Sequence, residues 1–175
     1  VAGTSVYKDE LESQVASEVV TLRSLPCSRP AGYRVTEDCC PAEDFIIVER
    51  GVLGSYLLDL YAARKIGLDR SPNTGGSFSI DSGATPLDDM IGSVERGILI
   101  GRFSGGRPSA NGDFSGVAKN SYYVENGAIQ YPISETMVSG NLKRLLLDIT
   151  AVSAERTDFG VGAFPWMQTA GVTVS

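Results

Sequence analysis

The dipeptide Asn126-Gly127 constrains the fold more than any other local feature of this sequence. It separates two runs in which apolar and polar residues alternate, residues 114–125 and 128–133. Asn and Gly both accept the positive φ angles of a tight turn, so the pattern predicts a β-hairpin. A second glycine turn, Arg50-Gly51, divides residues 45–59 into two strand-like halves. The two hairpins require antiparallel pairing, which a helical bundle does not contain.

Between these hairpins, short segments have helical spacing. Helices are predicted over residues 5–16, 60–67, 84–97 and 141–149. Further strands are predicted within residues 18–24, 98–103, 134–140, 149–155 and 164–175. Together these segments predict an α+β fold. It is mainly antiparallel β-sheet, rich in hairpins, with three or four short helices and a barrel-like closure as one option.

Local signals place the ends of two of these helices. Lys65 and Gly67 suit the C-terminal end of the helix at 60–67, since a cation favours the dipole and glycine accepts the left-handed cap. Thr85 and Asp88 have the spacing of a capping box around Pro86, so Thr85 is expected to begin the helix at 84–97.

The absence of histidine narrows the chemistry that this chain can perform. Its 175 residues include 15 Lys and Arg, 21 Asp and Glu and no His. Without an imidazole, this chain alone supplies neither a Ser-His nucleophile nor a histidine-ligated zinc site. Its net charge of −6 argues against binding to the phosphate backbone of nucleic acids.

Other patterns that could carry chemistry are weak. The pair Asp88-Asp89 suits the first turn of a helix, where acids favour the dipole. The glycine-rich residues 101–113 lack the terminal GK[ST] of a phosphate-binding loop. Lys119 and Ser121 could form a Ser-Lys pair, yet residues two apart in a strand share a face by periodicity alone. The residues by themselves support a soluble α+β fragment without a self-contained active site.

Cysteine content and chain ends suggest where such a protein resides. Cys27, Cys39 and Cys40 are odd in number and two are adjacent, which does not make a disulfide framework and favours a reduced, cytoplasmic chain. No apolar run approaches the roughly 20 residues that span a bilayer, so no membrane contact is expected. Because both ends look cut, the chain is expected to be a fragment of a longer protein.

Three motifs then occur in a distinctive order: GDFS at residues 112–115, VENGAIQYP at 124–132 and SGN at 139–141. In this order and spacing, the chain resembles the C-terminal domain of the TldD/PmbA family, whose members are often labelled modulators of DNA gyrase. Residues 48–67 and 3–21 are also similar to that family. The resemblance covers nearly the whole chain, so residues 1–175 are expected to be this C-terminal domain.

The resemblance implies a zinc-dependent peptidase system that trims or matures peptides in the cytoplasm. In the TldD type, an HExxxH helix supplies two histidine ligands and a glutamate base, and a cysteine in the C-terminal domain is similar to a third ligand. The PmbA type, also called TldE, lacks the histidine motif and partners the active subunit. The two types are expected to share a fold and to assemble as a dimer that holds an extended peptide.

This chain departs from the active pattern of the family. The HExxxH helix would precede Val1, and the expected cysteine, which would follow Gly160–Gly162, is replaced by Ala163-Phe164. The missing cysteine and the residues around the motifs at 124–132 and 139–141 are both more typical of the PmbA type. Residues 36–40 also differ from the family, and the zinc role is not moved to Cys39 or Cys40. No catalytic or metal-binding residue and no cofactor is therefore assigned here, with zinc expected only in a TldD-type partner or an upstream segment.

The leading hypothesis is a PmbA-like subunit of a metallopeptidase complex, with a scaffold and peptide-binding role. Its expected partners are a TldD-like subunit or a second copy, and a peptide. Whether the parent is itself an enzyme stays open: the alternatives are the C-terminal half of an active TldD-like peptidase, or an interaction module acting on DNA gyrase or its toxin. The predicted peptide-binding residues are Arg102, Asn111, Asp113, Phe164 and Trp166.

Overall fold

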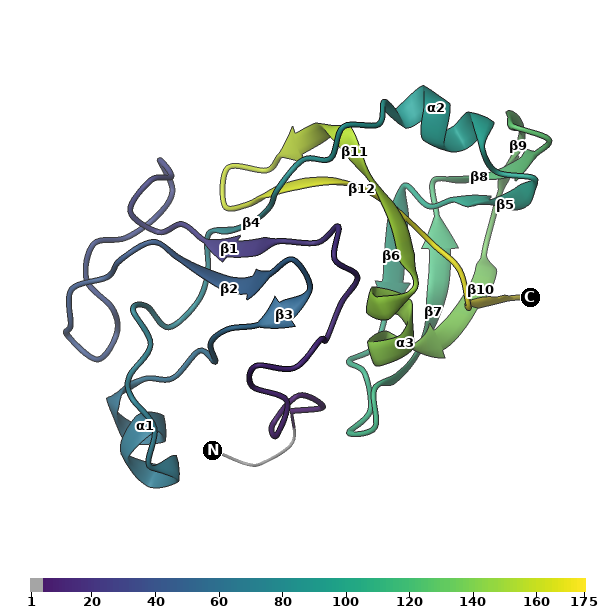
Figure 1. The fold of residues 1–175 in the computed structure, drawn as a ribbon. Helices are drawn as coiled ribbons and strands as arrows, with labels where there is room; N and C mark the ends of the chain where they lie inside the picture. Colours follow the sequence, from purple (N-terminus) through teal and green to yellow (C-terminus); the bar gives the residue numbers. More distant parts are fainter. Residues whose placement is uncertain (1–4) are drawn as a thin grey trace.

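The computed structural model describes residues 5–175, in which strands dominate over helices (Figure 1). The strands up to residue 105 are β1 (Leu22–Ser24), β2 (Phe45–Glu49), β3 (Val52–Leu53), β4 (Phe78–Ile80), β5 (Arg96–Leu99) and β6 (Arg102–Gly105). Those after residue 105 are β7 (Asp113–Lys119), β8 (Ser121–Glu125), β9 (Ala128–Ile133), β10 (Thr136–Asn141), β11 (Ile149–Asp158), β12 (Ala163–Thr169) and β13 (Thr173–Val174). The helices are α1 (Leu60–Ile66), α2 (Leu87–Gly92) and α3 (Leu142–Leu147). The α+β class and the largely antiparallel pairing are confirmed.

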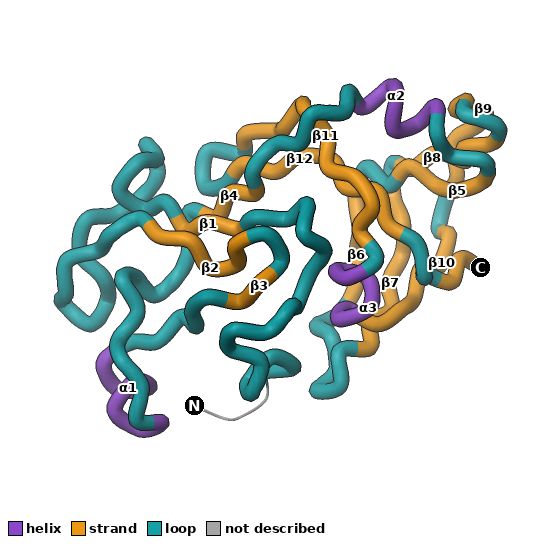
Figure 2. Tube along the Cα trace, in the orientation of Figure 1, coloured by secondary structure: helices purple, strands orange, loops and turns teal. Residues whose placement is uncertain are grey.

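A six-stranded sheet in the order β11-β12-β4-β1-β2-β3 joins the two halves of the chain. All of its strand pairs are antiparallel except β12 with β4. The core cluster of this sheet contains Val15 together with Ile47 and Val48 of β2 and Leu53 of β3. Burial of these apolar side chains away from water stabilises the cluster. Long loops (teal) connect this part, and β11 and β12 extend from it toward the second half (Figure 2).

Residues 96–141 form one long three-stranded meander, and each of its three strands is broken at the same height in the sheet. Above the interruption the strand order is β5-β8-β9, and below it β6-β7-β10, with β13 added beside β10. Leu99 pairs with Tyr122 and Arg102 pairs with Lys119, so the register of the first two strands is the same on both sides. The second and third strands also keep one register there, from Ser121 with Ile133 to Thr136 with Ala118. The two small sheets are therefore one meander with a bend.

Three short breaks make this bend. They lie at residues 100–101, at Asn120 and at residues 134–135. Asn120 and Glu135 have positive φ angles of 49° and 55°. Gly101 approaches the facing strand so closely that a Cβ at this position would overlap the backbone oxygen of Asn120. Glycine is therefore required at residue 101 for steric reasons.

Several local predictions are confirmed. The turn Asn126-Gly127 has φ angles of 49° and 76°, and Arg50-Gly51 has 46° and 80°, as a tight hairpin turn demands. The predicted helix 60–67 is α1, which ends at Gly67 in the left-handed conformation. The predicted helix 141–149 is α3, and the Asn141 side chain caps it by accepting from the amides of Lys143 and Arg144.

Other local predictions are wrong, because tertiary contacts use the same residues differently. Residues 5–16 form turns rather than a helix, and Gln14 makes an isolated bridge with Val52. The helix expected over 84–97 covers only Leu87–Gly92, and Thr85 is not its cap. Thr85 instead bridges Ser153.

Two further expectations are also corrected. The strand expected over 98–103 is split by the bend into β5 and β6, where Gly101 faces Asn120. The barrel-like closure is not found in the described part of the chain, since each sheet is open. Gly3 and Thr4 of the segment that resembles the family lie outside the described residues. None of the helices within residues 5–175 has the length and apolar character that a bilayer crossing requires.

Candidate functional site

Three of the five predicted peptide-binding residues lie on the β6–β7 hairpin. Arg102 begins β6, and all four residues of β6 are exposed. β6 is the edge strand of its sheet, so one side of its backbone faces no neighbouring strand in the described residues. Asn111 and Asp113 lie at the other end of the hairpin, where the loop returns into β7.

Asn111 and Asp113 belong to a polar cluster around Asn141. Asn111 Nδ2 donates to Asp113 Oδ2 at 2.7 Å, and Asn141 Nδ2 donates to Asp113 Oδ1 at 2.9 Å and to the Asn111 carbonyl at 3.0 Å. The cluster therefore ties the hairpin loop to the start of α3. Arg102 pairs with Lys119, six residues from Asp113 along β7, which is about 20 Å at the rise of a strand. The structure therefore does not bring Arg102 to this cluster.

Phe164 and Trp166 lie on β12, in the six-stranded sheet. The Phe164 ring packs 6.3 Å from the ring of Phe159, and the Trp166 backbone amide donates to Ser153 Oγ at 2.8 Å. Both side chains are half-buried. The five predicted residues thus fall at three separate places and do not form one site.

The residues present do not suit a zinc ion. Within residues 5–175, no three His, Cys, Asp or Glu side chains are grouped as metal ligands would be. The Cys27 thiol contacts the Ala42 carbonyl oxygen at 3.0 Å, and Cys39 is exposed. Ala163, at the position where the resemblance implies a cysteine ligand, is 1% exposed and has no donor side chain. The Ser-Lys pair is not formed either, because the buried Ser121 hydroxyl donates to the Lys119 carbonyl at 2.8 Å.

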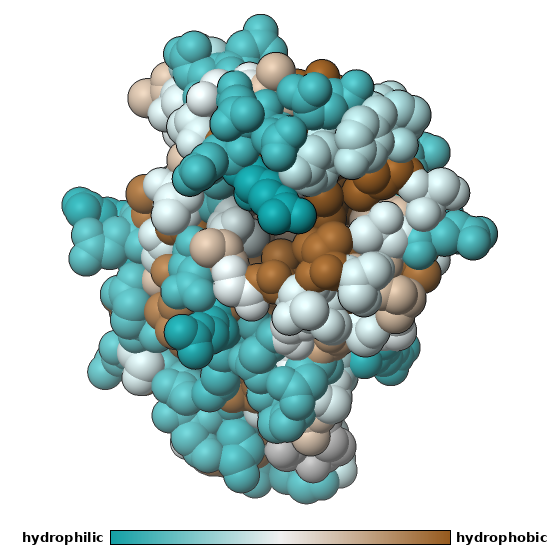
Figure 3. Space-filling model, turned by 90° about the vertical axis from the view of Figure 1, so that its right-hand side faces the viewer, coloured by the Kyte–Doolittle hydropathy of each residue, from teal (hydrophilic) through white to brown (hydrophobic). Residues whose placement is uncertain are grey.

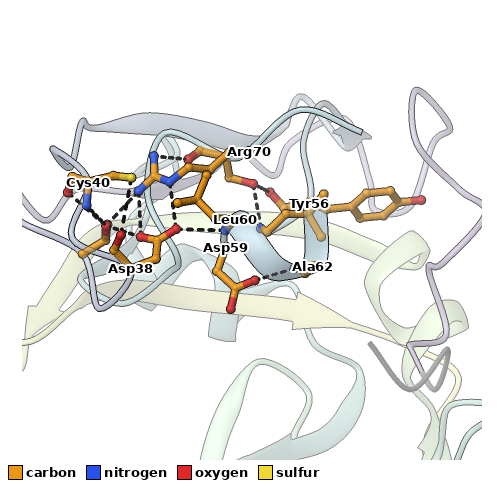
Figure 4. A network of polar contacts seen from close by, with 10 residues as sticks. Asp38, Cys40, Tyr56, Asp59, Leu60, Ala62 and Arg70 are labelled. Carbon is orange, nitrogen blue, oxygen red and sulfur yellow. Dashed lines mark hydrogen bonds and ion pairs between the residues drawn. The ribbon is translucent and has the colours of Figure 1, made fainter. Parts of the chain in front are cut away.

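A polar network that the sequence did not reveal joins residues 36–40 to α1 (Figure 4). Arg70 Nε donates to Asp38 Oδ2 at 3.0 Å, and the amide of Leu60 donates to the same oxygen at 2.9 Å. Thr36 Oγ1 also donates to the carboxylate. These hydrogen bonds, that of Arg70 first, hold the pKa of Asp38 well below its usual range. Asp38 and Arg70 are 32 residues apart, so no local pattern could predict their contact.

The same network caps and fastens helix α1. Asp59 Oδ1 accepts from the Ala62 amide at 2.6 Å, which is a helix N-cap. Arg70 also donates to the Ser71 carbonyl at 2.8 Å, and the Ser71 hydroxyl donates to the Tyr56 carbonyl at 2.5 Å. Because its groups are engaged in these contacts, the network is structural and is not a free binding site.

Two cavities lie on the surface of the described residues. One, of about 580 Å³, lies beside α1, and its lining includes Tyr33, Leu57 and Asp59. The other, of about 510 Å³, lies at the bend of the meander between residues 119–122 and 132–135. Both volumes are within the range of small-molecule sites.

The face that carries β8–β10 and the C-terminal end shows an apolar patch among hydrophilic residues (Figure 3). Exposed apolar side chains on β8, β9, β10 and β13 include Tyr122, Ile129, Tyr131, Met137 and Val174. These side chains do not all share one face of the sheet, since Tyr122 pairs with Pro132 whereas Tyr131 pairs with Tyr123.

Comparison with known proteins places this fold. A family described as "PmbA/TldA metallopeptidase C-terminal domain" matches residues 1–175. The chain belongs to this family. The confirmed resemblance extends over the motifs at 112–115, 124–132 and 139–141, which lie on β7, the β8–β9 hairpin and the end of β10.

Individual relatives agree with the family. The chain is 30% identical to the metalloprotease PmbA of Escherichia coli O157:H7 over 98% of its own length and 41% of that protein. It is 27% identical to a TldD homologue of Buchnera aphidicola over 91% of its length and 36% of that protein. The chain thus spans about two fifths of the length of these relatives.

Solved structures show the same fold. A Bacteroides thetaiotaomicron protein described as a candidate modulator of DNA gyrase superposes with a TM-score of 0.89 at 29% identity, over 99% of this chain and 40% of that one. TldE from Thermococcus kodakarensis superposes with a TM-score of 0.82 at 22% identity, over 98% of this chain and 43% of that one. The second likeness concerns the fold alone.

Proposed function

We propose that this chain is the C-terminal domain of a PmbA-like (TldE-like) subunit of a cytoplasmic metallopeptidase complex that processes peptides. Its role in the complex is to support the assembly and to bind the peptide, while a TldD-like partner or an upstream segment holds the zinc. One observation carries the choice of subunit: Ala163 and Phe164 stand where the active type is expected to have a cysteine ligand. Ala163 is buried in β12 and Phe164 packs on Phe159, so an apolar contact replaces a metal ligand there.

The metal content of the protein tests this assignment. The full-length parent is purified alone and with its TldD-like partner, and zinc is measured in each sample together with cleavage of an unstructured peptide. We expect zinc and cleavage only in the mixed complex. Tightly bound zinc in a one-to-one ratio in the parent alone overturns the proposal and favours the active TldD-like alternative. An HExxxH motif directly upstream of Val1 would favour the same alternative.

The proposed place for an extended peptide is the free edge of β6. A peptide that adds a strand to this edge is recognised by backbone groups, which explains why no cluster of side chains marks the site. Residues Arg102–Gly105 pair with β7 on one side only within the described residues. The arginine at the start of β6 would then contact acidic or carbonyl oxygens of the peptide.

Two proline variants separate this edge from the rest of the fold. In an antiparallel strand, the amides of neighbouring residues point to opposite sides, so one of Phe103 and Ser104 donates toward β7 and the other toward the free edge. The proline at the inward amide, F103P or S104P, is expected to destabilise the sheet. The proline at the outward amide should keep the melting temperature but reduce peptide affinity several-fold. Unchanged peptide affinity in a folded outward variant contradicts strand addition at β6.

A role on DNA gyrase or its toxin is the second candidate. The description of the Bacteroides thetaiotaomicron structure as a candidate modulator of DNA gyrase supports it, whereas the net charge of −6 does not support direct DNA contact. Affinity capture with the full-length parent discriminates between the two. Recovery of gyrase at micromolar affinity without a peptidase partner favours the gyrase role, and recovery of a TldD-like subunit favours the peptidase complex.

A further inference from the structure

The cavity at the bend of the meander, defined by residues 119–122 and 132–135, is a site with its own chemistry. Its two walls are the facing ends of β7–β8 and β9–β10, which pair across it. Tyr122 faces Pro132 in the register, and Ser121 faces Ile133. The cavity is therefore built by the meander itself, and its volume of about 510 Å³ can hold a ligand the size of two or three amino acids.

Two opposite charges stand at the edges of this cavity. The shared register places Lys119 opposite Glu135, because their neighbours Ala118 and Thr136 are paired. Oppositely charged residues that face each other on neighbouring strands commonly pair. Here neither side chain takes part in any ion pair among the residues that the structure describes. Both are exposed and line the cavity, so one ammonium and one carboxylate are open to a ligand.

The wall between these charges mixes polar residues, Asn120, Ser121 and Ser134, with apolar ones. Tyr122, Pro132 and Ile133 are its apolar residues, and Tyr122 is 41% exposed although its side chain is aromatic. An aromatic ring beside a proline offers a flat surface for an aliphatic side chain. The cavity thus combines a cation, an anion and an apolar surface within a few residues.

The backbone at the bend is held in a conformation that costs energy. Asn120 and Glu135 are both left-handed, with φ angles of 49° and 55°. Asn tolerates this region, but a Glu there is disfavoured. Such residues persist where the surrounding structure enforces them, and they are concentrated at functional sites. Glu135 therefore combines a disfavoured backbone conformation with a place in the lining of the cavity.

We propose that this cavity binds short peptides with free ends and apolar side chains. The peptide carboxylate pairs with Lys119, the peptide ammonium with Glu135, and the apolar side chains lie on Tyr122 and Pro132. This inference rests on the proposed function only in taking peptides as the ligands that the protein meets. The site takes a different ligand from the neighbouring β6 edge, where Arg102 pairs with Lys119, because an extended chain without free ends cannot satisfy both charges.

Calorimetric titration of the full-length parent tests the site, with the dipeptide Leu-Leu as the probe. N-acetyl-Leu-Leu and Leu-Leu amide each lack one charged end. We expect Leu-Leu to bind and each blocked form to bind about threefold more weakly, because each loses one charge-assisted contact with an exposed side chain of the cavity. Equal affinities of the three compounds, or no binding of Leu-Leu, overturn the proposal.

Two variants assign the ends of the peptide. K119M should weaken Leu-Leu and remove the difference between the free and the amidated C-terminus. E135Q should remove the difference between the free and the acetylated N-terminus. The matched controls are K8M and E18Q, which change exposed charges outside the cavity and should bind as the wild type does. Wild-type selectivity in both cavity variants overturns the assignment.

The outcome is independent of the peptidase assignment. If Leu-Leu does not bind but the mixed complex still contains zinc and cleaves a long peptide, the cavity proposal fails alone. If Leu-Leu binds with the expected end selectivity but no peptidase partner is found, the proposed function fails and the cavity site stands.

Discussion

The loop at residues 36–40 and the bend of the meander have the same backbone feature with opposite surroundings. Cys39 in the loop and Glu135 at the bend are both non-glycine residues with positive φ, at 59° and 55°. Around Cys39, the side chains of Thr36 and Asp38 are hydrogen-bonded to Arg70 and to backbone groups. Around Glu135, the charges make no ion pair within residues 5–175. In the loop, the polar side chains around the left-handed residue are hydrogen-bonded to one another and stabilise the fold. At the bend, the charged side chains around the left-handed residue are open to a ligand.

The largest effect is expected where the loop network is broken. In R70M the donors to Asp38, Thr36 and the Ser71 carbonyl are lost, while the Asp38 side chain, 14% exposed, keeps its charge. Leaving such a carboxylate without its partner should lower the melting temperature by roughly 5–10 °C. Thermal unfolding followed by circular dichroism measures this change. R144M is the control, because Arg144 is 79% exposed and its ion pair with Asp148 is long, at 3.6 Å, so its loss should change the melting temperature little. A similar loss in both variants contradicts a structural role of the network.

The loop network should also give the protein a distinctive dependence on pH. The Arg70 and Thr36 hydrogen bonds lower the pKa of Asp38 in the folded state, so its stabilising charge is fully present above the unfolded pKa of about 3.9. That contribution is lost as the pH falls through the lower, folded pKa. The stability difference between wild type and D38N should be largest near neutral pH and shrink steadily below about pH 4. Urea unfolding at several pH values measures it, and a constant difference would show that the charge is not the cause.

At the bend, the largest loss of stability is expected where Gly101 approaches the backbone of Asn120. In G101A the new Cβ overlaps the backbone oxygen of Asn120, and backbone cannot move as a flexible side chain can. The substitution should destabilise the protein by about 1–3 kcal/mol, measured by chemical denaturation. G106A is the matched control, since a Cβ at Gly106 meets nothing within 4 Å. Equal stability of the two variants would mean that the bend opens freely.

The smallest effect concerns the strain at Glu135. Replacing it with glycine relieves the left-handed conformation, while the more flexible unfolded chain offsets part of the gain. E135G should therefore raise the free energy of unfolding by no more than about 1 kcal/mol. E125G, at the end of strand β8 where the backbone has no positive φ, should lower it by a similar amount because glycine weakens strands and the hydrogen bond from Tyr123 is lost. A clear loss of stability in E135G would show that the side chain, rather than the backbone, holds the bend.

Predictions from the sequence succeeded where the deciding residues are neighbours in the chain and failed where they are far apart. The hairpin turns and the C-terminal end of α1 were predicted, because a positive φ or a glycine cap is decided by neighbouring residues. The helix at 5–16 failed because Gln14 bridges Val52, which is 38 residues away. The cap at Thr85 failed because Thr85 bridges Ser153. In both cases distant backbone groups outcompeted a weak local preference.

The sequence by itself determined the hairpin-rich α+β class and the family, because turn chemistry and the order of short motifs are local properties of the chain. It also determined that these 175 residues supply no histidine to any site. Only the tertiary structure decided that the predicted peptide-binding residues lie at three places, that Asp38 meets Arg70, and that Lys119 and Glu135 face one cavity. Those contacts join residues far apart in the chain, and they form only when pairing of the strands brings their backbones together.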